Sequence, residues 1–229
     1  MTLQGLIDIF RLESDDLKTP PLWTDDELIE YANDGEEQAC RRSRLLVDST
    51  TDSVCSLSFT AGSSPLLTLS PFILGIRGVT WISSGVPVVR RVLIPMLGSR
   101  MDEAIPDWET AVVQPGSQPS VYVTGIETQA IRLHPTPAVN GTVELSVFRL
   151  PIDKMAALGD EPSIPVYAQR ALVQWMLYRA YSKQDADALD AEKAKSAYSL
   201  FVQEFGDAKS ARNQAWQMQE MRVFPDPLC

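Results

Sequence analysis

The sequence predicts an α+β protein: a helical bundle built by both ends of the chain, with an inserted antiparallel β-sandwich or barrel-like domain. Helical periodicity marks residues 1–50 and returns in residues 156–222. Between them, in residues 51–155, this periodicity vanishes and Ser, Thr, Val, Gly and Pro dominate. The chain has 229 residues, 45% of them hydrophobic, which is enough to bury a core without disulfides.

The first two helices are marked by apolar spacing and by a capping signal. Four apolar side chains share one face of a short helix at 3–12: Leu3, Leu6, Ile7 and Phe10. Prolines at 20 and 21 interrupt the helical pattern. Thr24 and Glu27 then form a capping box, in which each side chain bonds to the other's backbone N–H. We expect this second helix to run to about Val47.

The middle of the second helix carries a stripe of small residues that permits close approach by another helix. Its members are Ala32, Gly35 and Ala39. Glycine there costs about 1 kcal/mol relative to alanine, which close packing would offset. Arg41 and Arg42 follow near the helix C-terminus, where the helix dipole favours cations. We expect these five residues to form a subunit interface. The alternatives for the arginines are a DNA contact and a surface role that complements the dipole.

The central block reads as about seven short strands. They are expected at 53–59, 66–69, 72–82, 86–94, 120–125, 130–134 and 141–150. Ser83-Ser84-Gly85 predicts a turn between two of them, and Ser99–Trp108 predicts a short helical or turn segment. Asn140-Gly141 predicts a type I′ hairpin that joins 131–134 to 143–150.

Three helices and an extended tail are expected after the central block. The segment from Ala168 to Tyr181 is apolar on nearly all sides, which is typical of a central, buried helix. A second helix at 187–205 should end at Gly206, because glycine favours the conformation that terminates helices. A weaker third helix, 208–222, precedes a proline-containing extended tail at 223–229.

Residues suited to catalysis are scarce. The chain has one histidine, His134, and lacks both a Gly-x-Ser-x-Gly elbow and a glycine-rich phosphate loop. Cys40, Cys55 and Cys229 are widely spaced, which gives neither a disulfide framework nor a zinc-type pair. The sequence therefore predicts no enzyme, no cofactor and no metal site. A hydrolase that uses His134 is the catalytic alternative, and substitution of His134 would test it.

Charge and hydropathy narrow the classes of partner. Thirty acidic and twenty basic residues give a net charge of −10, and residues 1–52 alone contribute −8. This acidity disfavours a surface that neutralises nucleic-acid phosphates. It fits either a solvated helical surface or a wall that faces something which must not stick, such as moving DNA. No apolar run reaches the ~18 residues of a membrane span, so we expect no membrane contact.

The C-terminal arm, about 207–229, carries apolar residues that suit a partner surface. They are Trp216, Met218, Met221, Phe224, Pro225 and Leu228. The arm could instead fold back on its own bundle, and the sequence leaves these two readings open.

Three groups of motifs, in order along the chain, resemble tailed-phage head-to-tail connectors, also called portal adaptors or tail tubular protein A-like proteins. The first is Pro20–Asn33 followed by Ala39-Cys40-Arg41-Arg42. The second pairs Leu133–Pro137 with Val147–Pro151. The third runs from Ile164-Pro165 through Leu172–Trp175 and Tyr178–Asp187 to Phe205-Gly206.

The resemblance implies a structural virion protein that forms a ring, usually a dodecamer. The ring would dock under the portal protein, continue the DNA channel without specific DNA binding, and support a tail or nozzle protein. Its place would be the head–tail junction of the virion, with the host cytoplasm as the site of assembly. The C-terminal arm would carry the portal contact. Two alternatives remain: a neighbouring stopper-type connector, and a ligand-binding β module with helical flanks.

Overall fold

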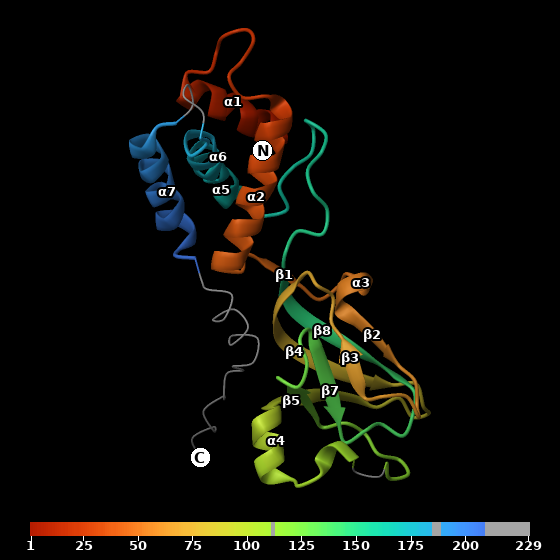
Figure 1. Cartoon of the computed structure of the whole chain (residues 1–229). Coiled ribbons are helices and arrows are strands. Elements are labelled where there is room, and N and C mark those ends of the chain that lie inside the picture. The colour runs from red at the N-terminus through yellow and green to blue at the C-terminus, as the bar shows by residue number, and fades with distance from the viewer. Residues whose placement is uncertain (111–112, 185–188, 209–229) are drawn as a thin grey trace, which may run out of the picture. The chain divides into compact units, whose positions relative to one another are not determined.

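The computed structural model describes residues 1–110, 113–184 and 189–208, which divide into two compact units (Figure 1). Residues 1–46 and 150–208 make the helical unit, and residues 47–149 make the β unit. The predicted mixture of helices and sheet is confirmed.

The helical unit is organised around one central helix. It contains α1 (Leu3–Ser14), α2 (Asp25–Ser43), α5 (Val166–Gln169), α6 (Leu172–Tyr181) and α7 (Ala191–Phe205). Helix α6 packs against α1, α2 and α7, and its apolar residues are buried on several sides. The segment from Ala168 to Tyr181 is therefore central as predicted, but a break after Gln169 divides it between α5 and α6.

Helix α2 begins as predicted and ends earlier. The Thr24 side chain accepts from the Glu27 N–H, and the Glu27 carboxylate accepts from the Thr24 N–H, so the capping box is confirmed. The predicted extension to Val47 is wrong, because Arg44 adopts a left-handed conformation with φ 52°. A short strand, β1 (Leu46–Asp48), follows and buries Leu46 and Asp48 on alternate positions.

Helix α7 ends where glycine predicts it should. Gly206 caps the helix with φ 80°, a conformation that glycine adopts without strain. The helix begins at Ala191, where the Asp190 carboxylate accepts from the Lys193 N–H. The helix predicted at 208–222 lies outside the described residues, apart from Ala208.

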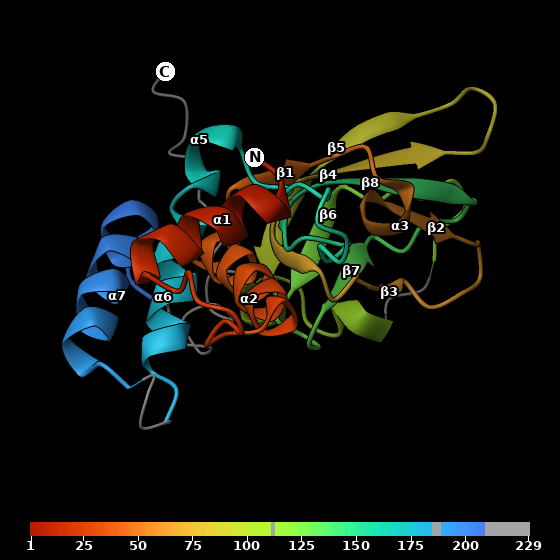
Figure 2. The same ribbon diagram turned by 90° about the horizontal axis from the view of Figure 1, so that it is seen from above.

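The β unit is one curled sheet of eight strands (Figure 2). After β1 come β2 (Ser56–Phe59), β3 (Leu66–Thr68), β4 (Ile73–Ser83), β5 (Arg90–Leu97), β6 (Val121–Thr124), β7 (Ala130–His134) and β8 (Gly141–Arg149). The spatial order is β1-β8-β4-β5-β6-β7-β3, with β2 beside β8. Three short helical segments connect them: α3 (Asp52–Cys55), α4 (Gly98–Ala104) and η1 (Trp108–Thr110).

The prediction of an antiparallel sandwich or barrel-like domain is confirmed in part: the strands form a curled half-barrel, but not a sandwich, and one pairing is not antiparallel. Strands β5 and β6 are parallel, with Ile94 opposite Val121, and all eight strands belong to a single sheet. A parallel pair needs a long crossover connection. The segment between Leu97 and Val121, which contains α4 and η1, supplies it. The turn predicted at Ser83-Ser84-Gly85 is confirmed, because β4 and β5 pair as an antiparallel hairpin.

The hairpin predicted at Asn140-Gly141 is wrong. Strand β8 pairs with β2 and β4, whereas β7 pairs with β3 and β6. Gly141 instead is the first residue of β8, where a Cβ atom would overlap the buried Trp81 ring. Glycine is required at this position by the close approach of an aromatic side chain, not by a turn.

Candidate interaction surfaces

The small-residue stripe of α2 contacts a helix of its own chain. Ala32, Gly35 and Ala39 are buried, and α2 packs on α6. A Cβ atom on Gly35 would lie 3.1–3.3 Å from side-chain atoms of Trp175. Because these residues are already covered within the subunit, the described conformation does not present them to a neighbouring copy.

The two arginines at the end of α2 have different environments. The Arg42 guanidinium is buried and lies 5.1–5.4 Å from the ring centres of Trp175, Tyr198 and Phe201. It also donates to the Gly206 carbonyl at 3.0 Å, so Arg42 joins the ends of α2 and α7. Arg41 is half-buried and pairs with Glu37 one turn earlier at 2.6 Å. Of the five predicted interface residues, Arg41 is therefore the one with substantial exposure.

The other predicted contact residues belong to the C-terminal arm. Trp216, Met218, Met221, Phe224, Pro225 and Leu228 all lie outside the described residues. Their assignment to the portal contact stays a prediction.

His134 sits at the end of β7 in a setting that favours the neutral imidazole. Its ring packs edge-on against Trp108, with 5.7 Å between ring centroids. Burial and the nearby charge of Arg132 lower the pKa of His134 below its ordinary value. Within the part of the chain that the structure describes, no group of three or more His, Cys, Asp or Glu side chains could hold a metal ion.

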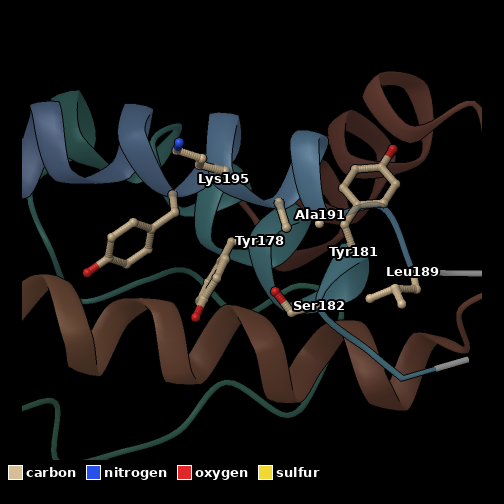
Figure 3. Close-up of a pocket in the computed structure, with 8 residues that line it drawn as sticks. Tyr178, Tyr181, Ser182, Leu189, Ala191 and Lys195 are labelled. Carbon is tan, nitrogen blue, oxygen red and sulfur yellow. The ribbon is translucent and has the colours of Figure 1, made fainter.

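A shallow pocket of about 430 Å³ opens between α6, the segment after it and the first half of α7 (Figure 3). Its lining consists of Tyr178, Tyr181, Ser182, Leu189, Ala191, Ala194, Lys195 and Tyr198. The Tyr178 and Tyr198 rings pack against each other in a tilted arrangement with 5.0 Å between their centroids, so this wall of the pocket is aromatic packing within the subunit. The described lining offers a lysine and hydroxyl groups, without a carboxylate or histidine to act as a general base.

A buried carboxylate organises the start of the β unit. Asp48 accepts hydrogen bonds from the backbone N–H groups of Thr50 and Thr51, and from the Arg149 Nε at 2.6 Å. Burial alone would raise the pKa of Asp48, but these hydrogen bonds hold it well below its usual range. Asp48 is thus charged at neutral pH and ties β1 to the end of β8.

Two exposed aliphatic surfaces were not predicted from the sequence. The hairpin surface lies on β5 and the turn before it: Val86 is fully exposed, and Val88, Val92 and Ile94 are 64, 72 and 62% exposed. The loop surface, residues 12–26, exposes Leu12, Leu17 and Leu22 at the end of α1 and in the connection to α2. The sequence signal for the hairpin surface was an unbroken Val-Pro-Val-Val run beside Ser-Ser-Gly. The sequence signal for the loop surface was the set of leucines around the prolines that interrupt the helical pattern.

Exposed aliphatic surfaces on both units are typical of a protein that works by binding other proteins. A sequence model of the SU10 adaptor protein family matches residues 1–223, so the chain belongs to the SU10 adaptor protein family. It is a phage structural adaptor of the head–tail type and not an enzyme. A search of the curated proteins finds no match.

Membership of this family indicates where the protein belongs and which kind of partner it has. A structural adaptor belongs to the virion and contacts other head or tail components. None of the described helices is both long and apolar enough to cross a membrane. The narrower resemblance to tail tubular protein A stays a prediction.

Proposed function

We propose that this protein forms a ring, a dodecamer, that joins the portal of the phage head to the tail and continues the DNA channel. The observation that carries the proposal is the family match, which spans residues 1–223 and includes both units. The resemblance to portal adaptors, carried by motifs in both units, supports the same role. One face of the ring would bind the portal protein and the other the tail or nozzle protein.

The charge of the chain suits a channel through which DNA slides. A net charge of −10 for each copy, multiplied around a ring, repels phosphate and disfavours specific DNA binding. A closed ring of identical copies also needs two different patches on each subunit, because its interfaces are heterologous. The chain's own helices cover Ala32, Gly35, Ala39 and Arg42, so the half-buried Arg41 is the one of the five predicted residues that a neighbouring copy could touch.

Electron microscopy of the purified chain, with and without its portal protein, tests this function. We expect an annular density stacked coaxially on the portal when both are present. A particle that binds the assembled tail but never the portal would contradict the proposal and favour the stopper-type connector. The same experiment with the portal protein of an unrelated phage controls for nonspecific stacking of rings.

The portal contact is assigned to the C-terminal arm. Its apolar residues each gain about 1.5–3 kcal/mol when fully buried, so a partner groove would stabilise them. Pro225 and Pro227 restrict the tail and lower the entropy lost on binding.

Deletion of 207–229 should leave a folded chain that no longer co-purifies with portal. The substitution Trp216→Ala with Met221→Ala should weaken co-purification without altering the described fold. Unchanged portal affinity after the deletion would show that another part of the molecule makes the contact.

A further inference from the structure

We propose that the hairpin surface of one copy binds the loop surface of the next copy, and that this contact closes the ring. The inference rests on the proposed function and names the two patches that the ring requires. Each surface is apolar, each is exposed, and the two carry opposite charge.

The hairpin surface is an apolar stripe on a strand with an open edge. Residues 90, 92 and 94 lie on one face of β5, and the exposed Val86 and Val88 precede the strand. Arg90 to Leu93 pair with β4, whereas β6 joins the other side of β5 only from Ile94 onward. Figure 2 shows the β4–β5 hairpin, in yellow, with its turn standing clear of the other strands. Edge strands with exposed aliphatic side chains invite pairing with another chain, so a partner is expected here.

The loop surface is held in a fixed conformation. Asp16 is buried and accepts from the Arg11 guanidinium at 2.9 Å and from the Leu22 N–H at 2.7 Å. The same arginine pairs with Asp25 at 2.7 Å, which ties the loop to the start of α2. The exposed leucines are therefore presented on an ordered scaffold. A preorganised surface loses less conformational entropy on binding than a free loop does.

Charge complementarity identifies the occupant as a second copy. Residues 82–94 contain no acidic residue and two basic ones, Arg91 and Arg90, of which Arg90 pairs with Glu144 of β8. Residues 12–26 contain five acidic residues and one basic residue, Lys18. Arg11 pairs with Asp16 and Asp25, whereas Glu13 and Asp26 are exposed. Both surfaces are aliphatic, and the basic end of the hairpin would lie against the acidic loop. Because the two patches differ, the contact is head-to-tail and can repeat around a ring.

Charge exchange between the surfaces tests the contact. The hairpin variant is R90E/R91E, the loop variant is E13K/D26K, and R100E/R170E is a control with a matched charge change at exposed arginines elsewhere. Sedimentation velocity and native mass spectrometry measure self-association, and circular dichroism and thermal unfolding check each fold. A further variant, V88S/V92S, removes aliphatic contact while leaving the exposed Arg90–Glu144 ion pair in place.

We expect the wild type and the control to self-associate, and each surface variant to remain a monomer. An equimolar mixture of R90E/R91E and E13K/D26K should assemble again, because alternating copies restore every charge pair. Failure of the mixture to assemble, with rescue only when all four substitutions share one chain, would place the contact within a chain and overturn the proposal. Self-association that persists in all surface variants would overturn these patches while leaving the proposed ring intact. A wild type that is monomeric at every soluble concentration would also overturn the proposed contact between the two surfaces.

Discussion

At the scale of single residues, Trp175 connects the parts of the helical unit. Its ring lies against Gly35 of α2 and packs 4.8 Å from the Phe201 ring of α7. Its Nε1 donates to the Asp34 carboxylate at 2.9 Å, and the Arg42 guanidinium lies over the ring. One side chain thus fills the space that the small residue at position 35 leaves.

Trp175→Ala should lower the free energy of unfolding by about 3–5 kcal/mol, because it empties this space. Urea denaturation followed by circular dichroism measures the loss. Trp175→Phe is the matched control: it keeps most of the apolar contact and should cost about 1 kcal/mol for the hydrogen bond to Asp34. Equal losses for the two variants would mean that packing against Gly35 contributes little.

Asp48 gives the β unit a specific sensitivity to acid. Its pKa is lowered in the folded state, so its stabilising effect is present above the unfolded-state value of about 4 and is lost as pH falls below that. Asp48→Asn should cost about 3 kcal/mol at neutral pH, because Arg149 loses its buried partner. This difference from wild type should shrink as pH falls from about 4. Denaturation curves across acidic pH measure it, with the exposed Asp52→Asn as the control.

At the scale of elements, the start of α2 is determined locally. Thr24 and Glu27 satisfy backbone N–H groups that the helix itself cannot. Lys183 bonds to the same Glu27 carboxylate at 2.6 Å and, together with the Thr24 N–H, lowers its pKa. The cap therefore also links α2 to the end of α6.

Thr24→Ala should lower the free energy of unfolding by about 1 kcal/mol through loss of the cap. Thr24→Ser keeps the hydroxyl oxygen and should be close to wild type. Thermal unfolding of the two variants measures the difference. If the serine variant were destabilised as much as the alanine variant, the cap hydrogen bond could not be the cause.

Elements with local causes could be predicted from the sequence, and those with distant causes could not. Thr24 starts a helix, Gly206 ends one, and Ser83–Gly85 turns a hairpin through interactions within a few residues. The turn at Gly141 was predicted wrongly, because the feature that requires glycine there, the ring of Trp81, lies sixty residues earlier in the chain. The parallel β5–β6 pair likewise depends on where a long connection leads. The hairpin surface escaped prediction because a pattern such as Val88-Val89-Arg90-Arg91-Val92 gives no sign of which face is covered.

At the scale of the whole molecule, acidity is concentrated in one unit. Residues 1–46 and 150–208 hold 20 acidic and 11 basic side chains, a net of −9, whereas residues 47–149 hold 8 and 6, a net of −2. Any surface of the helical unit that faces DNA would therefore repel it over a Debye length of about 8 Å at physiological salt.

The protein should show no tight binding to duplex DNA at physiological salt. Fluorescence anisotropy with a labelled duplex measures this, and binding at sub-micromolar duplex would contradict it. Lowering the salt should leave binding weak, since the net repulsion then increases. The charge-reversal variant E13K/D26K should bind no worse than wild type, and any gain would identify the acidic loop as a source of the repulsion.

Because residues 1–46 share a unit with residues 150–208, the helical unit is begun first during synthesis but completed after the β unit. Helices α1 and α2 are made first, yet α6, which covers them, begins about 130 residues after α2 ends. At about 5–20 residues per second, the ribosome needs roughly 6–25 seconds to supply it. The sheet is complete once β8 has emerged, so the β unit can fold while α1 and α2 still expose Leu6, Phe10 and Leu28. During synthesis the first helices therefore pass through a period in which their apolar side chains lack the helix that covers them in the folded unit.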